Sequence, residues 1–162
     1  MSNLEPNIEQ QVAKFEAQCR NRGLKVTHQR VEIYRALAES SAHPDAETVY
    51  KQVRMSVRAI SVDTVYRTLA WLTENGFAFP AGAGVGPTRY DANMQPHHHF
   101  VCRRCGRVQD FFCPSLDALP VPSVVGELGR VESAHVQVLG ICAACAAKQS
   151  GENSASAVPD AD

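Results

Sequence analysis

The sequence contains no apolar run approaching the about 20 residues that a membrane-spanning helix needs, which excludes a protein that spans a bilayer. The segment Met1–Gln11 carries acidic side chains and lacks the basic-then-apolar pattern of a secretory signal peptide. Its composition, 44% hydrophobic and 20% charged residues, is that of a folded globular protein. We therefore expect a cytoplasmic protein with a hydrophobic core and no membrane contact.

The net charge is also small, because the charges of the 162 residues sum to only −1. Taken by itself, this value argues against a basic nucleic-acid binder. The charge is unevenly distributed. Cys19–Arg67 holds nine Lys and Arg against five Asp and Glu, giving +4, and Gly86–Gln149 holds six against five, giving +1. Ser150–Asp162 has three acidic and no basic residues, and its small polar composition predicts a disordered acidic tail. The +4 segment fits either an ordinary solvated face or a DNA-binding one.

The six cysteines do not favour a disulfide framework, because four of them form two C-x2-C pairs. Each pair can turn two sulfurs toward one ion, and four thiolates suit a tetrahedral zinc with a structural role. Two disulfides or four free thiols are the alternatives. Cys19 lies on an apolar helical face, which predicts a buried core thiol, and Cys113 has no neighbour at this spacing. The candidate zinc ligands are Cys102, Cys105, Cys142 and Cys145.

Four amphipathic helices and a hairpin are predicted in the N-terminal half. Apolar residues recur at helical spacing in four segments, each bounded by residues that start or stop helices. Two short β-prone segments then flank a loop with three glycines, which predicts a β-hairpin. Helices followed by a hairpin indicate a winged helix-turn-helix. The expected boundaries are Gly23 after the first helix, Thr27, Asp45 and Ser61 at the starts of the next three, Asn75-Gly76 after the fourth, and the strands Phe77–Phe79 and Thr88–Tyr90.

The fourth predicted helix carries a polar face that suits the major groove of DNA. Hydroxyl, phenol and guanidinium groups can contact base edges, thymine methyls and phosphates, and a helix N-terminus offers amide donors to a phosphate. The alternative is an amphipathic helix whose polar face is merely solvated. Val65, Leu69 and Leu72 are expected to face the core, so Thr64, Arg67 and Thr68 are expected to face outward, with Tyr66 to one side.

Three consecutive histidines precede the first cysteine pair. In a strand, residues i and i+2 share a face, so His97 and His99 can chelate one metal while His98 points elsewhere. Asp91 lies upstream, and Asp110 falls on the expected return strand, Arg107–Phe112. Imidazoles combined with carboxylates suit Fe(II), Mn(II), Co(II) or Zn(II). The alternative for such a triplet is a solvated turn or an expression tag.

Taken together, these segments resemble the ferric uptake regulator (Fur) family. Any one match is weak, but they occur in family order and cover about residues 8–148. The matching segments are Gly23–Arg30, His43–Tyr50, Ser61–Leu69 and His97–Gly106, with Asp110 and Cys142–Cys145.

The resemblance implies an α+β protein that acts as a dimeric, metal-dependent transcriptional repressor with no small-molecule substrate. Its winged helix-turn-helix DNA-binding domain would span residues 1–85, a small α/β dimerisation domain with a four-cysteine zinc knuckle residues 86–149, and the tail residues 150–162. The partners would be a second copy of the chain and an AT-rich inverted repeat in double-stranded DNA. The segment Ser61–Asn75 would be the recognition helix, and the DNA contacts would be Lys25 in the minor groove with Ser61, Thr64, Tyr66 and Arg67.

The resemblance also nominates a regulatory metal site with ligands from both domains: His43, Asp91, His97, His99 and Asp110. Asp110 resembles the peroxide-responsive branch, whereas iron-uptake regulators usually carry Glu at this position. In that branch the ion is Fe(II), and peroxide oxidises a histidine ligand, here His43 or His97. One structural Zn²⁺ and one regulatory Fe²⁺ or Mn²⁺ per chain are therefore implied. Iron sensing is the alternative, and zinc sensing is disfavoured because Phe77–Gln95 lacks the extra cysteine that zinc sensors usually carry.

The sequence departs from the family pattern at three places. The family's third metal site uses a histidine where this chain has Ala134, and His135 is one residue out of place. Pro120 and Pro122 interrupt a family helix, which we expect to be short or displaced. The dipeptide Cys113-Pro114 can ligate haem iron in some regulators, although a plain loop cysteine is the simpler interpretation.

Two functions of other classes compete with the repressor. A metallohydrolase could use the HxH pair and the two aspartates to activate water. No H-E-x-x-H or H-x-H-x-D-H motif and no spare general base at motif spacing supports it. A metal-independent zinc-ribbon adaptor would leave the five nominated regulatory ligands without a role.

Overall fold

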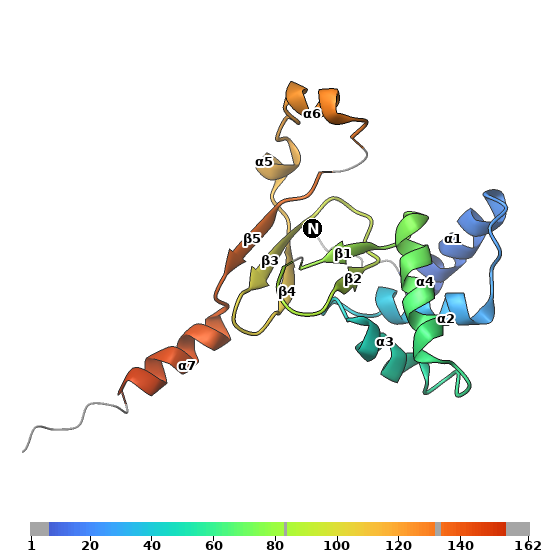
Figure 1. Cartoon of the computed structure of the whole chain (residues 1–162), viewed down its shortest axis with the longest axis horizontal. Helices are drawn as coiled ribbons and strands as arrows, with labels where there is room; N and C mark the ends of the chain where they lie inside the picture. The colour runs from blue at the N-terminus through green and yellow to red at the C-terminus, as the bar shows by residue number, and fades with distance from the viewer. Residues whose placement is uncertain (1–6, 83, 132–133, 155–162) are drawn as a thin grey trace, which may run out of the picture. The chain divides into compact units, whose positions relative to one another are not determined.

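The computed structural model describes the backbone of residues 7–82, 84–131 and 134–154, and the side chains through Lys148. The chain forms two compact units that divide between Gln95 and Pro96 (Figure 1). Within the described ranges, no helix has the length and apolar character needed to cross a membrane. Each unit is built around its own cluster of buried side chains.

The first unit contains the four predicted helices. They are α1 (Ile8–Asn21), α2 (His28–Ala38), α3 (Ala46–Val53) and α4 (Val62–Glu74). Each begins after a residue whose side-chain oxygen accepts a backbone N–H of the first turn, which satisfies a donor that has no partner inside the helix. Three of these N-caps, Thr27, Asp45 and Ser61, are the residues predicted from the sequence, and Asn7 caps α1.

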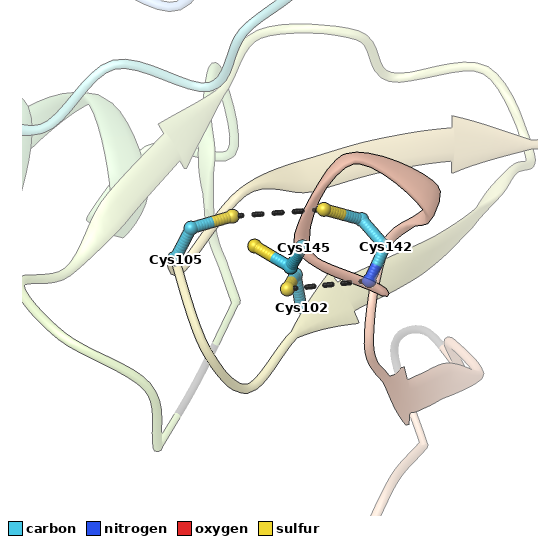
Figure 2. Close-up of side chains that lie close together, drawn as sticks. All are labelled: Cys102, Cys105, Cys142 and Cys145. Carbon is cyan, nitrogen blue, oxygen red and sulfur yellow. Dashed lines mark hydrogen bonds between the residues drawn. The ribbon is translucent and has the colours of Figure 1, made fainter. Parts of the chain in front are cut away.

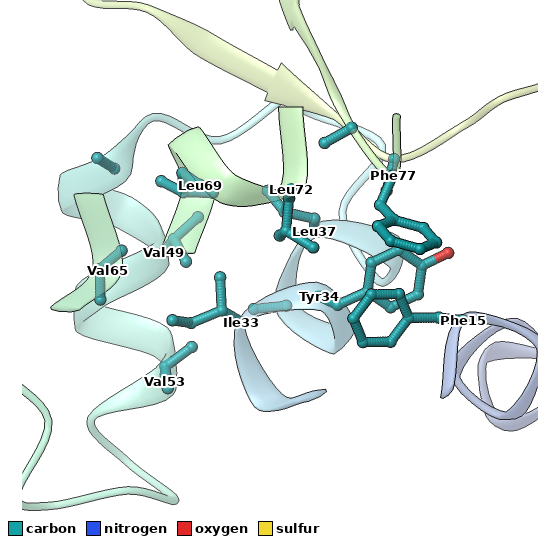
Figure 3. Packing of buried hydrophobic residues seen from close by; sticks show 14 of the residues in the cluster. Phe15, Ile33, Tyr34, Leu37, Val49, Val53, Val65, Leu69, Leu72 and Phe77 are labelled. Carbon is teal, nitrogen blue, oxygen red and sulfur yellow. The ribbon is translucent and has the colours of Figure 1, made fainter. Parts of the chain in front are cut away.

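One apolar core holds the four helices together (Figure 3). Val49 of α3, Ile33 of α2 and Leu69 and Leu72 of α4 are fully buried. At one end of the cluster the ring of Phe15 stacks on Tyr34 at 4.2 Å and meets Phe77 edge-on at 4.8 Å. The cluster fixes α4 against α2 and α3, so that the opposite face of α4 is presented outward.

The predicted hairpin is present, but its first strand is shifted. β1 (Phe79–Ala81) pairs antiparallel with β2 (Arg89–Asp91), with Phe79 opposite Asp91. The sequence prediction placed the first strand at Phe77–Phe79, which is wrong because Phe77 and Ala78 are buried in the helical core. Helices followed by this hairpin give the winged helix-turn-helix.

The second unit is a three-stranded sheet with helices at its connections. The strands β3 (His98–Cys102), β4 (Val108–Phe111) and β5 (Gln137–Gly140) lie in the order β4-β3-β5, with β3 antiparallel to β4 and parallel to β5. The crossover from β4 to β5 contains only short helices, α5 (Pro114–Asp117) and α6 (Ser123–Leu128). The prolines between them account for the interruption, as predicted. The last helix is α7 (Ala143–Ser154).

Two predicted boundaries are corrected by the structure. The units divide ten residues after the expected 85/86 boundary, because β2 pairs with β1 and belongs to the first unit. The disordered tail was predicted to begin at Ser150, whereas α7 continues to Ser154. The remainder of the predicted tail, residues 155–162, lies outside the described residues.

The first unit's core generates a stability prediction. Leu72→Ala removes a fully buried side chain between α4 and its neighbours, and we expect it to lower the free energy of unfolding by about 2–5 kcal/mol. Glu74→Ala, two residues away on the exposed side, should change it by less than about 0.5 kcal/mol. Urea titration of both variants measures the difference, and equal midpoints would contradict the assigned packing.

Candidate metal centres and nucleic-acid interface

The four knuckle cysteines converge on one point in the second unit (Figure 2). Their sulfur atoms all lie within 4.8 Å of one another, and the sulfurs of Cys105 and Cys142 are 3.8 Å apart. Sulfurs held about 2.3 Å from a tetrahedral zinc stand about 3.8 Å apart, so the group has the dimensions of a four-cysteine zinc site. All six cysteines of the chain are free thiols, so the disulfide alternative is not supported.

Backbone pairing produces this convergence. Cys102 ends β3 directly beside Gly140 of β5, which brings the segment after β5 to the first cysteine pair. The turn after Cys102 closes through a 2.9 Å hydrogen bond from Gly106 N to Cys102 O, and Gly106 adopts a φ of 69°, which favours glycine. The backbone N–H of Cys142 donates to Cys102 Sγ at 3.3 Å.

The close packing of the cysteines shifts the pKa values of two of the thiols in opposite directions. Backbone N–H groups of Cys142 and Cys105 donate toward Cys102 and lower its pKa to about 6, so this sulfur is a thiolate at neutral pH. Hydrogen bonding to Cys142, burial and the neighbouring sulfurs raise the pKa of Cys145 to about 12. Sulfurs packed this closely cannot all ionise without a cation among them, and a bound dication would remove that conflict.

The first unit contributes two of the predicted regulatory ligands. Nε2 of His43 lies 3.1 Å from Oδ2 of Asp91, and both side chains are buried. The other oxygen of Asp91 accepts the backbone N–H of Asn93 at 2.6 Å, which fixes the carboxylate. His43 has a φ of 50°, the one positive value at a non-glycine position among the described residues.

The second unit contributes the other three. Nε2 of His97 and Nε2 of His99 are 3.0 Å apart, and Oδ1 of Asp110 lies 3.8 Å and 3.4 Å from them. His99 stands opposite Asp110 in the β3–β4 ladder, so the register itself joins them. Ligand atoms about 2.1 Å from an octahedral ion stand about 3.0 Å apart, so these donors fit a first-row divalent metal. Each group thus has the spacing and the nitrogen and oxygen donors that such an ion requires.

The remaining candidates lie apart from these groups. Nε2 of His98, on the other face of β3, lies 3.1 Å from Oδ1 of Asp117. Ala134 and His135 are both exposed. The Cys113 sulfur lies 3.1 Å from the Ser115 hydroxyl, outside the four-cysteine group, and Cys19 is a fully buried core thiol as predicted.

The outward face of α4 differs from the prediction at one residue. Tyr66 is 54% exposed, and Arg67 is exposed and forms an ion pair with Asp63 at 3.0 Å. Thr68 was expected to face outward, but it is only 6% exposed. A helix face that packs on a core is wide enough to include positions 65, 68, 69 and 72 together, so Thr68 belongs to the buried stripe. The hydroxyls of Ser61 and Thr64 are 2.9 Å apart at the helix start.

Arg30 is a residue near the nucleic-acid interface that the sequence did not reveal. Its guanidinium lies over the Trp71 ring, 3.8 Å from the centroid, and donates a hydrogen bond to the backbone oxygen of Lys25. Arg30 therefore connects the segment that carries Lys25 to α4. In the sequence it was one of nine positive charges and the last residue of the Gly23–Arg30 match, and its contacts with Trp71 and Lys25 were not predicted.

The model of the ferric uptake regulator family matches residues 21–137, a span that includes α2 to α4, the hairpin and the strands β3 and β4. The chain belongs to the ferric uptake regulator family. This match covers most of the chain and includes the candidate regulatory ligands and the first cysteine pair.

A sequence relative and two solved structures are informative. The peroxide-responsive repressor of Staphylococcus epidermidis is 29% identical over 141 residues, which are 86% of this chain and 93% of the relative. The Helicobacter pylori ferric uptake regulator, described as having three functional metal-binding sites, superposes with a TM-score of 0.70 at 24% identity over 90% of this chain and 97% of its own. A zinc uptake regulator in complex with zinc and DNA superposes with a TM-score of 0.63 at 23% identity over 89% and 98%.

Membership of the family decides the functional class. The chain is a metal-responsive transcriptional repressor of this family, not an enzyme. The metallohydrolase alternative is therefore wrong. The metal-independent zinc-ribbon adaptor is likewise not supported, because the family is metal-responsive.

The four-cysteine group generates a prediction about zinc. Cys102→Ser should abolish binding of one equivalent of zinc and the cooperative melting of the second unit, because structural zinc supplies folding free energy, about 10–16 kcal/mol in zinc-finger peptides. Metal content and thermal melting of the purified protein are the measurements. Cys113→Ser, outside the group, should retain both. A Cys102→Ser protein that keeps its zinc and its melting transition would refute the assignment.

Proposed function

We propose that the protein is a homodimeric repressor that binds an AT-rich inverted repeat while metal-loaded and releases it when peroxide oxidises a histidine at an Fe(II) site. The observation that carries the proposal is the pair of ligand groups. His43 with Asp91 lies on one side of the division between the units, and His97, His99 and Asp110 lie on the other. Each group is an incomplete coordination sphere, and together they supply five ligands.

A single ion bound by all five residues would tie the DNA-binding unit to the second unit. In a symmetric dimer, that tie sets the distance between two recognition helices, which must match the spacing of the two half-sites. Moving a dimer from about 1% to 99% competent requires the metal to favour the competent form by about 5.5 kcal/mol. Losing His43 and Asp91 from the coordination sphere in the open form can account for a difference of that size.

The peroxide response is supported by Asp110 and by similarity to a peroxide-responsive repressor. Fe(II), when bound, would donate the first electron that splits the O–O bond of peroxide, and the imidazole that gains the oxygen would return an electron to the iron, so that peroxide and histidine together give one oxidised histidine and one water. His43 and His97 would then be the side chains that gain oxygen, which would remove a ligand and release the metal. An iron-responsive uptake repressor of the same family is the alternative, and it would use the same five residues.

DNA recognition is assigned to the exposed start of α4 and to the segment before α2. Tyr66 and Arg67 are exposed side chains on α4, and Ser61 and Thr64 place hydroxyls at its N-terminus, where backbone N–H groups favour a phosphate. Lys25 is exposed and would enter a narrow A·T-rich minor groove. Because the net charge is only −1, specificity would depend on these contacts and on dimer spacing more than on bulk charge.

Homodimerisation is assigned to the second unit. β5 forms an edge of the described sheet, and Val138, Leu139 and Ile141 in and after it are 41–48% exposed. Apolar side chains gathered at a sheet edge favour association with another chain. The cysteine group would hold one Zn²⁺ per chain and keep this edge in place, while the regulatory site would hold one Fe²⁺ or Mn²⁺ per chain. A repressor of this kind would act in the cytoplasm.

Metal-dependent DNA binding tests the core of the proposal. Mn²⁺-loaded protein should bind an AT-rich inverted repeat at low nanomolar concentration, and protein stripped of its regulatory metal but not of zinc should bind at least about 100-fold more weakly, because effector couplings reach about 1–3 kcal/mol per site. His97→Ala should lose the metal response, and His135→Ala, an exposed histidine outside both groups, should keep it. Fluorescence anisotropy measures all four. Equal binding with and without metal would reject the regulatory site.

The peroxide response has its own test. Brief exposure of the Fe²⁺-loaded protein to peroxide should add one oxygen atom to a peptide containing His43 or His97 and should release the DNA. The Mn²⁺-loaded protein should be spared, because Mn(II) does not donate an electron to peroxide as readily. Peptide mass spectrometry distinguishes the sites. Oxidation confined to cysteines would exclude the histidine mechanism and favour the iron-responsive alternative.

A further inference from the structure

The segment between α2 and α3 contacts β2 through one isolated antiparallel bridge. Asp45 forms a bridge with Arg89, and the N–H of Tyr90 donates to the oxygen of Pro44 at 3.1 Å. In an antiparallel pair, one step back on the first strand matches one step forward on the second. The register therefore sets His43 opposite Asp91, and their side chains meet at 3.1 Å.

The backbone of this segment is weakly held in two respects at and beside His43. Proline has no N–H, so Pro44 cannot return the hydrogen bond that its partner Tyr90 donates, and the pairing there is one-sided. His43 also adopts a φ of 50°, in the left-handed region that non-glycine residues populate sparsely. A conformation of this kind persists only where surrounding contacts hold it.

Arg89 provides such a contact. Its guanidinium NH1 donates to the backbone oxygen of His43 at 3.1 Å. Its Nε is buried and has no hydrogen-bond partner among the described residues. The same guanidinium lies near Asp45 and helps to lower the pKa of that carboxyl, after the hydrogen bonds from Thr48. Asp45 in turn caps α3 by accepting the N–H of Thr48 at 2.8 Å.

We propose that Arg89 is the positioning residue of the regulatory metal site. By donating to the His43 oxygen it adds a second hydrogen bond between this segment and β2 beside the one-sided Pro44–Tyr90 pairing, and it holds His43 in the left-handed conformation that presents its imidazole to Asp91. Arg89 does not touch the metal. Without it, the segment around His43 can relax, and the site loses one pre-placed ligand.

The inference rests on the proposed regulatory site, and its test is a metal titration of the full-length, zinc-loaded protein. Mn²⁺ affinity is measured for the wild type, Arg89→Gln and Arg89→Lys, with Arg58→Gln as an exposed arginine control. Loss of an outer-shell partner costs about 10–100-fold in metal affinity, so Arg89→Gln should bind Mn²⁺ at least about tenfold more weakly. A lysine offers one compact ammonium group in place of the planar guanidinium with its several N–H donors. Arg89→Lys should therefore bind Mn²⁺ about threefold more weakly. Arg58→Gln should bind as the wild type does.

A second comparison distinguishes the positioning of His43 by Arg89 from a general effect of Arg89 on stability. Leu72→Ala destabilises the same unit from α4, outside the segment that carries His43, and should keep wild-type Mn²⁺ affinity while folded. Wild-type affinity in Arg89→Gln, or an equal loss in Leu72→Ala at matched stability, would overturn the inference. If Arg89→Gln does not fold, wild-type affinity in Arg89→Lys would overturn it. A wild-type protein that takes up no second metal would refute the proposed function instead.

Discussion

Strand register is the constraint on which all three ligand groups depend. His99 stands opposite Asp110 in an antiparallel ladder, and the pairing of Asp45 with Arg89 sets His43 opposite Asp91 in another. The parallel pairing of Cys102 with Gly140 carries the second cysteine pair to the first. Side chains alternate along a strand, so a slip of one residue in any of these ladders would turn a ligand to the wrong face. The hydrogen bonds of the backbone thus fix the donor atoms before any metal is present.

The two kinds of metal group have different electrostatic character. Cys102, Cys142 and Cys145 are buried and Cys105 is exposed, and a thiolate at Cys102 attracts a cation at neutral pH. A closed group of four strong donors leaves no position for a substrate or a water, which suits a permanent structural ion. The histidine and aspartate groups offer harder, weaker donors from two separate units. Donors of this kind suit an ion that comes and goes.

Much of the first unit could be predicted from the sequence, because local interactions decide helix ends. Thr27, Asp45 and Ser61 cap helices where their side chains reach the first-turn N–H groups, and that requires only a few neighbouring residues. The predictions failed where packing overrides local pattern. Phe77 joins the aromatic cluster rather than a strand, and Thr68 lies in the broad buried stripe of α4. Helix α7 also extends to Ser154, beyond the predicted start of the disordered tail.

The sequence by itself determined the residue types and spacings of the metal ligands, since C-x2-C and H-x-H are local patterns whose geometry follows from a tight turn or one strand. It also determined the helix caps and, through resemblance, the family. Only the tertiary structure decided how His43 meets Asp91, how Arg30 connects Lys25 to Trp71, and how Arg89 supports His43. These contacts join residues far apart in the chain, and their existence depends on strand register and core packing, which no short stretch of sequence encodes.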